Sequence, residues 1–171
     1  MKKVLLVVAS KDYQPIEYAI PKAILEAGGV TVITASNSLG KAVAIDNSET
    51  EVDILLDKVV AGDYDGIFFI GGPGALEYLD NEKSYKIIRE VAASEKFWGA
   101  ICISPRILAN AQVLKGRKIT GWDGDNKLEE ILSAVNAGYV HKPVVVDNNL
   151  ITASGPAAAK EFGEEILKKL S

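Results

Sequence analysis

Residues 98–105, with the sequence WGAICISP, decide the fold predicted for this chain. A short apolar run ends at Cys102, and small residues stand two positions to either side of it, at Ala100 and Ser104. A nucleophile on a sharp strand-to-helix turn needs such neighbours, because bulky side chains two residues away would clash. The proline that follows suits the first turn of a helix. The stretch therefore predicts a nucleophile elbow, with a buried strand before Cys102 and a helix over 105–112.

Strands and helices are expected to alternate along most of the remaining chain. Continuous apolar runs predict buried strands, and apolar residues spaced by three and four predict helices. The expected strands are 4–9, 30–35, 65–70 and 98–102, and the expected helices are 16–27, 84–93, 105–112, 127–135 and a last one opened by Gly155 and Pro156. This order predicts an α/β fold with a mainly parallel central sheet and helices on both faces, formed by one domain over residues 1–171.

Three further segments carry a weaker pattern. Residues 41–56 contain β-branched residues and are expected to hold one or two short strands. Residues 118–120 are a candidate strand. The segments 143–146 and 150–152 flank Asp147-Asn148-Asn149, which is typical of a hairpin turn. In a parallel sheet, sites form at the carboxyl ends of the strands, so the loop after the first strand, the glycine turn at 71–74 and the turn at Cys102 matter most.

The composition excludes several classes of protein. The net charge is −4, which argues against nucleic acid as the partner, because phosphate binding needs clustered Lys and Arg. No apolar run approaches the roughly 20 residues of a membrane span. The apolar run at 4–9 leads directly into polar residues and is interpreted as a strand, not as a signal peptide. A single cysteine excludes an internal disulfide. These features predict a cytoplasmic protein that binds neither nucleic acid nor membrane.

Three stretches of the sequence carry a resemblance to one family. Residues 99–105 look like the cysteine motif of the DJ-1/PfpI superfamily, 69–74 (FIGGPG) resemble its glycine turn, and 142–156 are similar to its C-terminal hairpin and the start of its last helix. The resemblance covers essentially the whole chain. It implies a three-layer flavodoxin-like sandwich, as in the class I glutamine amidotransferases, and a homodimer. It is specific for the fold and far less specific for the reaction.

Cys102 and Glu17 are the candidate catalytic residues. A thiol at a helix N-terminus feels the positive end of the helix dipole, which favours the thiolate. In the family that this chain resembles, a glutamate at the position of Glu17 approaches the cysteine sulfur and hydrogen-bonds to it. Glu17 also shares a helix face with Ile20 and Ile24, which are expected to point to the core. Burial would raise the pKa of the carboxyl and let it move a proton.

Backbone N–H groups are the candidate oxyanion donors. The resemblance implies that the glycine turn aims such groups at an oxyanion near the cysteine, and the candidates are Gly72, Gly74 and Ile103. An ordinary tight turn is the structural alternative for a Gly-Pro-Gly sequence. The turn lacks the glycine spacing of a dinucleotide-binding loop.

The histidines expected of relatives are absent. PfpI-type peptidases place a histidine directly after the cysteine, where this chain has Ile103, and isoleucine cannot accept a proton. DJ-1 carries one in the loop after the next strand, where this chain has Gly121-Trp122-Asp123. Asp123 is a possible third group, and Asp125 is an alternative to it. The only histidine, His141, is interpreted as an exposed structural residue at a strand margin.

Two function classes fit these residues. In the first, the protein responds to oxidative or carbonyl stress. Cys102 is oxidised to sulfenic or sulfinic acid, and Glu17 hydrogen-bonds to the oxidised sulfur. In the second, a glyoxalase-like lyase or deglycase, the Cys102 thiolate adds to a small aldehyde. The missing histidines favour the first class and argue against a peptidase; a binding protein with a relic cysteine is a third possibility. The expected partner is a small aldehyde or oxidant, and no cofactor or metal is expected, because one Cys and one His form no closed ligand set.

Overall fold

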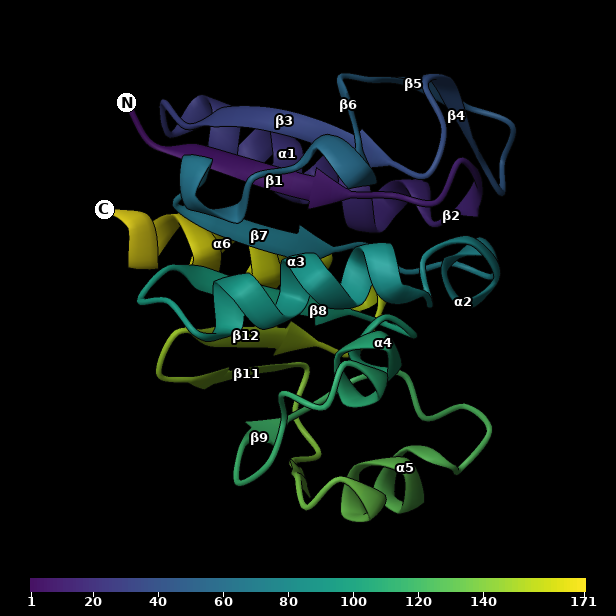
Figure 1. Ribbon diagram of the computed structural model, residues 1–171, viewed down its shortest axis with the longest axis vertical. Helices are drawn as coiled ribbons and strands as arrows, with labels where there is room; N and C mark the ends of the chain where they lie inside the picture. The colour runs from purple at the N-terminus through teal and green to yellow at the C-terminus, as the bar shows by residue number, and fades with distance from the viewer.

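A seven-stranded sheet runs through the centre of the molecule, as the computed structural model of residues 1–171 shows (Figure 1). The strand order is β11-β12-β8-β7-β1-β3-β6. All neighbouring pairs are parallel except β11 and β12, which form the terminal hairpin. The strands are β1 (Lys3–Val7), β3 (Thr31–Ser36), β6 (Ile54–Leu55), β7 (Gly66–Phe69), β8 (Phe97–Ile101), β11 (Val144–Asp147) and β12 (Leu150–Ala153). The predicted mainly parallel sheet is confirmed.

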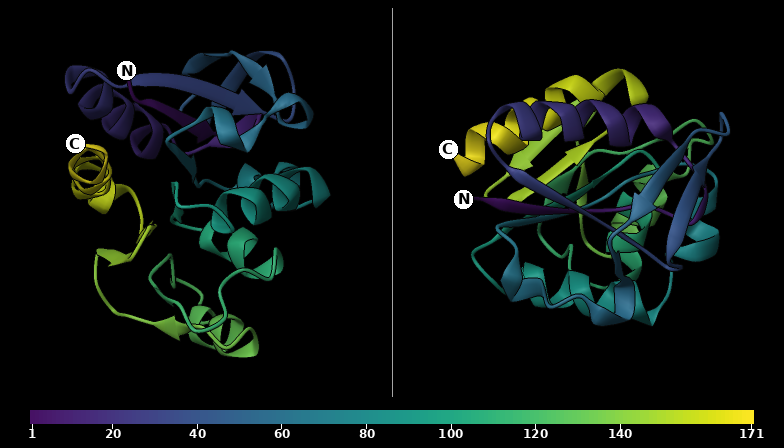
Figure 2. Two further views of the ribbon diagram at one scale, coloured as in Figure 1. Left: turned by 60° about the vertical axis from the view of Figure 1, so that its left-hand side comes forward. Right: turned by 90° about the horizontal axis from the view of Figure 1, so that it is seen from above.

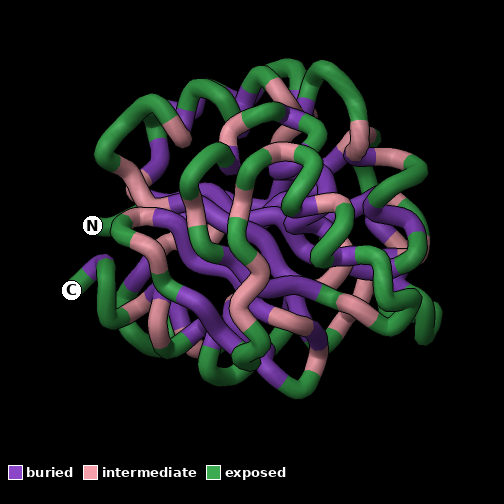
Figure 3. The backbone as a smooth tube through the Cα atoms, turned by 90° about the horizontal axis from the view of Figure 1, so that it is seen from below, coloured by how far each residue is buried: buried purple, intermediate pink, exposed green.

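Helices cover both faces of this sheet and give three layers. The helices α1 (Pro15–Ala27) and α6 (Ala159–Leu170) lie side by side on one face, and α3 (Glu82–Ala92) and α4 (Pro105–Asn110) lie on the other (Figure 2). The middle strands β1, β7 and β8 are almost entirely buried, as their apolar sequences require (Figure 3). Two shorter helices are α2 (Gly74–Tyr78) and α5 (Leu128–Ala134), and single 3₁₀ turns span Leu56–Lys58, Ala61–Asp63 and Pro156–Ala158. The predicted flavodoxin-like sandwich is confirmed.

Two small sheets lie outside the central one. The first consists of β2 (Lys11–Tyr13), β4 (Gly40–Ala44) and β5 (Glu49–Val52), and the second pairs β9 (Lys118–Ile119) with β10 (Gly138–Tyr139). The segment 41–56 therefore contributes to three strands, where the sequence predicted one or two. Strands β2 and β10, and helix α2, have no apolar periodicity of their own. They are two to five residues long and depend on tertiary contacts, so the sequence pattern could not reveal them.

The buried face of α1 differs from the predicted one. Its apolar stripe was expected to face the core, but Ile16 and Ile20 are 46% and 38% exposed. The buried positions are Glu17, Tyr18, Pro21 and Leu25. Helix α6 packs closely on this side, because a Cβ added at Gly163 would lie 2.9 Å from Pro21 Cα. The prediction that Ile20 shares the core face with Glu17 is wrong, although Glu17 itself is buried.

Candidate functional site

The site is built on the turn between β8 and α4. Cys102 adopts a left-handed backbone with φ of 64°, which costs a side-chain-bearing residue free energy unless its surroundings hold it there. Its N–H donates to the Ala153 carbonyl at 2.9 Å, and its carbonyl accepts from the Trp122 N–H at 2.7 Å. The buried Ser104 hydroxyl donates to the Ile70 carbonyl at 2.7 Å. Neighbouring loops thus fix the strained turn that presents the thiol.

The Glu17 carboxyl lies beside this thiol and is completely buried. Its Oε2 atom accepts a hydrogen bond from the Gly71 N–H at 2.9 Å. The Cys102 thiol also hydrogen-bonds to the carboxyl, whereas Oε1 has no well-aligned partner. Burial raises the pKa of Glu17 to about 7, and the hydrogen bonds with Cys102 and Gly71 only partly oppose this rise. Glu17 can therefore hold or release a proton near neutral pH.

The pKa of the half-buried Cys102 thiol is higher than the sequence indicated. Burial, followed by the negative charge of Glu17 and the hydrogen bond with it, raises the pKa of Cys102 to about 12. The backbone N–H groups of Ile103 and Gly72 hydrogen-bond to the sulfur and act in the opposite direction. The expectation that the helix start would favour the thiolate is contradicted, because α4 has only six residues and desolvation outweighs the backbone donors.

The glycine turn lets three segments meet at the thiol. A Cβ added at Gly71 would lie 2.6 Å from both Cys102 Cβ and Glu17 Oε2. Gly72 has φ of +114°, and a Cβ there would lie 2.5 Å from the backbone nitrogen of Gln14. Glycine is needed at both positions, because any side chain would push the carboxyl, the thiol and the loop after β1 apart.

Only two of the three candidate backbone donors lie at the thiol. The N–H groups of Gly72 and Ile103 reach the sulfur. Gly74 instead begins α2 and packs against the Lys11 backbone, where an added Cβ would lie 1.8 Å from the carbonyl oxygen. Gly74 is therefore a packing residue beside the turn and does not line the pocket over Cys102.

The candidate third group also lies elsewhere. Asp123 Oδ1 accepts from the Leu128 N–H at 2.9 Å, so this carboxylate caps the start of α5. Asp125 forms a two-pronged ion pair with Arg106, with N–O distances of 2.7 and 2.9 Å, and this pairing lowers the pKa of Asp125 to about 2. The exposed His141 contacts Tyr139, with the two rings tilted by 42° and their centroids 4.0 Å apart. None of these side chains lines the pocket over Cys102.

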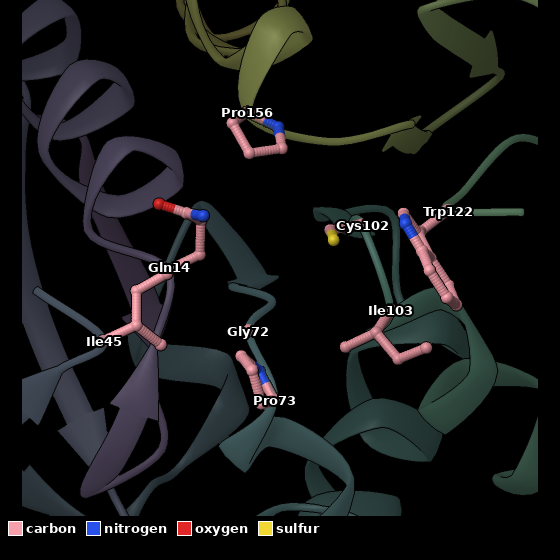
Figure 4. Close-up of a pocket in the computed structure, with 8 residues that line it drawn as sticks. All are labelled: Gln14, Ile45, Gly72, Pro73, Cys102, Ile103, Trp122 and Pro156. Carbon is pink, nitrogen blue, oxygen red and sulfur yellow. The ribbon is translucent and has the colours of Figure 1, made fainter. Parts of the chain in front are cut away.

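A pocket of about 470 Å³ opens above the thiol (Figure 4). Cys102, Ile103 and Trp122 lie on one side of it, and Gln14 and Ile45 lie across from them. The complete lining is Gln14, Ile45, Gly72, Pro73, Cys102, Ile103, Trp122 and Pro156. The sequence did not single out Gln14, Ile45 or Trp122 as site residues. The one available signal was a tryptophan inside the polar stretch 121–126.

No group of three or more His, Cys, Asp or Glu side chains is arranged to hold a metal ion. None of the helices is both long enough and apolar enough to span a membrane.

Comparison with known proteins agrees with the fold. Residues 2–169 match the DJ-1/PfpI family. The chain is 38% identical over 169 residues to an uncharacterized protein of Methanocaldococcus jannaschii, an alignment that covers 98% of this chain and 82% of that protein.

Solved structures share the fold of the whole chain. A ThiJ/PfpI domain protein from Brachyspira murdochii matches with a TM-score of 0.92 and 27% identity, over 98% of this chain and 95% of the other. DJ-1beta of Drosophila melanogaster matches with a TM-score of 0.88 and 28% identity, over 99% and 90%. An oxidized DJ-1 of Toxoplasma gondii matches with a TM-score of 0.86 and 28% identity, over 99% and 91%.

Proposed function

This chain belongs to the DJ-1/PfpI family, and from that premise we propose that it converts small reactive aldehydes in a reaction that depends on Cys102, with Glu17 as the proton-transfer group. The observation that carries the proposal is the buried Glu17 carboxyl, whose pKa of about 7 suits a general base, in contact with a nucleophile at the bottom of an apolar pocket.

The first step is addition of the thiol to the carbonyl group. The sulfur forms a bond to the carbonyl carbon, and the electron pair of the C=O π bond moves to oxygen. Glu17 takes the thiol proton and returns it to that oxygen, which gives a hemithioacetal. The backbone N–H groups of Gly72 and Ile103 are the proposed donors to the developing oxyanion.

The same carboxyl can serve a second step if the substrate is a 2-oxoaldehyde. Glu17 takes the proton from the former aldehyde carbon and delivers it to the neighbouring carbon. The hydroxyl proton on the first carbon moves to the oxygen of the second, so that the adduct becomes a thioester with a hydroxyl group beside it. Water then releases a 2-hydroxy acid and restores the thiol. The sum is one 2-oxoaldehyde and one water giving one hydroxy acid, so no oxidant, reductant or cofactor is consumed.

Because the raised pKa keeps the Cys102 thiol protonated, it favours a reaction in which a base removes the proton during the attack over a reaction that needs a thiolate beforehand. A thiol with a raised pKa reacts slowly with peroxide, because the thiolate is the reacting form. A base that removes the proton during the attack avoids this limit. The raised pKa of Cys102 therefore supports aldehyde conversion ahead of oxidation, the reverse of the order that the missing histidines suggested.

Turnover of methylglyoxal, followed by its hydroxy acid product, tests the proposal. We expect Cys102→Ser to abolish turnover and Glu17→Gln to reduce it by roughly a hundredfold or more. Glu26→Gln, on the exposed side of α1, is the matched control and should stay within about twofold of the wild type. Turnover that survives in Cys102→Ser would refute the proposal.

Oxidation of Cys102 is the second candidate function. Two backbone N–H groups already point at the sulfur, and protonated Glu17 would add a third donor to a sulfinate. Peroxide is the co-reactant, and each peroxide transfers one oxygen to sulfur and leaves as water. A discrete two-oxygen adduct in intact mass spectra of peroxide-treated protein supports this function. Higher or heterogeneous adducts contradict it.

We further propose a homodimer located in the cytoplasm. The exposed apolar stripe of α1, which includes Ile16 and Ile20, is the surface that supports a dimer, because solvent-exposed apolar stripes on helices commonly mark protein contacts.

A further inference from the structure

The pocket over Cys102 has no charged side chain in its lining. Its polar side chains are the Gln14 amide and the thiol itself. A charged substituent entering this pocket would lose water without gaining a counter-charge, which is costly. The volume of about 470 Å³ lies in the range of sites that bind drug-sized ligands and far exceeds the needs of a three-carbon aldehyde.

Trp122 supplies the large aromatic surface of this pocket. Its side chain is 39% exposed and stands beside Cys102 and Ile103 (Figure 4). Its backbone N–H donates to the Cys102 carbonyl at 2.7 Å, so the residue is tied directly to the nucleophile turn. An indole ring in this position offers a flat apolar face to whatever is bonded to the sulfur.

Arg106 and Asp125 hold this indole in place. The buried guanidinium of Arg106 lies 5.4 Å from the ring of Trp122 and donates to its backbone carbonyl at 3.3 Å. Asp125, in the loop that follows Trp122, accepts two hydrogen bonds from the same guanidinium. On the indole edge, a Cβ at Gly124 would lie 2.4 Å from a ring carbon, so the backbone packs directly against the ring.

Arg106 and Asp125, which we call the Trp122 clamp, include one feature that lowers the stability of the folded protein. Arg106 Nε is buried without a hydrogen-bond partner, which costs free energy. An apolar side chain at this position of α4 would avoid that cost, but it could neither stack on the indole as a cation nor bind Asp125. The arrangement is therefore consistent with positioning of Trp122 as the role of Arg106.

We propose that the pocket selects uncharged carbonyl compounds with an aromatic or bulky apolar substituent, and that Trp122, positioned by Arg106 and Asp125, sets this preference. The carbonyl group in this statement rests on the proposed function. The preference for uncharged apolar groups rests on the lining of the pocket.

Alkylation of the single cysteine tests the preference without any turnover. The rate with N-phenylmaleimide is divided by the rate with N-ethylmaleimide, and the same ratio is measured for glutathione as a free thiol. We expect the protein ratio to exceed the glutathione ratio by roughly fivefold or more. Iodoacetamide should likewise be favoured over iodoacetate, and this preference should persist in Glu17→Gln, which removes the carboxylate that also repels iodoacetate.

Variants test whether Trp122, Arg106 and Asp125 cause the preference for N-phenylmaleimide. Trp122→Ala should bring the maleimide ratio down to that of glutathione, and Trp122→Phe should retain most of it. Arg106→Lys and Asp125→Asn should each lower the ratio, whereas Arg89→Lys on the exposed surface of α3 should not. Circular dichroism and thermal unfolding must show each variant to be as folded as the wild type, because alkylation through unfolded chains would itself bring the ratio towards that of glutathione.

The outcomes separate this inference from the proposed function. A wild-type ratio equal to that of glutathione, or a ratio unchanged in Trp122→Ala, would overturn the inference even if methylglyoxal is converted. A preference that depends on Trp122, without turnover of any aldehyde, would support the selectivity of the pocket and refute the proposed enzyme.

Discussion

At the scale of single residues, the pair of Glu17 and Cys102 determines the chemistry. Burial raises the pKa of both groups, and the negative charge of Glu17 raises the pKa of Cys102 further, whereas the hydrogen bond with Cys102 partly favours the Glu17 carboxylate. The pair therefore carries a proton that a free glutamate would have lost at neutral pH.

The first prediction concerns the pKa of Cys102. Glu17→Gln removes the charge that opposes the thiolate, so the pKa of Cys102 should fall below the value of about 12 found with Glu17 charged. Thiolate absorbance measured against pH gives both values, and Glu26→Gln should titrate like the wild type. A pKa that rises in Glu17→Gln would show that the carboxyl helps the thiolate more than its charge hinders it.

The second prediction concerns stability against pH. The pKa of Glu17 is raised from 4.5 to about 7, so the folded protein binds a proton that the unfolded chain releases between these values. Stability from this group is complete below pH 4.5 and is lost as the pH rises through 7. At about 1.4 kcal/mol per pKa unit, the loss is on the order of 3 kcal/mol.

Denaturant unfolding of the wild type and Glu17→Gln at pH 5 and pH 8 measures this loss. Glutamine stays neutral and can still accept the Gly71 hydrogen bond, so the variant should be the more stable protein at pH 8 and should gain much less at pH 5. Equal differences at the two pH values would contradict the shifted pKa.

At the scale of elements, the contact between α1 and α6 positions Glu17. Helix α6 approaches α1 closely at Gly163, where the nearest atom to an added Cβ is Pro21 Cα, and Pro21 is one helical turn from Glu17. Alanine normally stabilises a helix interior by about 1 kcal/mol relative to glycine.

Gly163→Ala should instead destabilise this protein. The added methyl group would press on a backbone atom at 2.9 Å, and overpacking of this kind typically costs 1–3 kcal/mol, so a net loss of about 1 kcal/mol is expected. Thermal unfolding measures it, with Gly62→Ala as the control because an added Cβ there meets nothing within 4 Å. A stabilised Gly163→Ala would show that the two helices can move apart freely.

The elements also show what could be predicted from the sequence. The buried strands and the elbow carry their own apolar and small-residue patterns, so the central sheet and the position of Cys102 followed from them. Helix α1 did not, because apolar residues surround it on several sides and only its contact with α6 decides which face is buried. Trp122 and Arg106 were missed because a cation stacked on an indole brings together residues of α4 and a loop, which no spacing in the sequence reveals.

At the scale of the whole molecule, the stripe that was expected in the core of the monomer is the stripe that remains exposed. Size-exclusion chromatography with light scattering should give a mass of about twice 18.3 kDa for the wild type. Ile20→Glu places a charge within the stripe and should shift the protein to the monomer, whereas Lys41→Glu, on strand β4, should not. A wild-type monomer at micromolar concentration would refute the proposed dimer.

The hydrogen bond from the Cys102 N–H to the Ala153 carbonyl has a consequence for biosynthesis. A ribosome makes the chain from its N-terminus, so β1, β7 and β8 exist well before β12. Until β12 docks beside β8, the Cys102 N–H lacks its acceptor, the Ala153 carbonyl, and the left-handed turn lacks one of the hydrogen bonds that fix it. The reactive centre is therefore completed only after β12 has been synthesised, so chains that stop before β12 do not carry the assembled site.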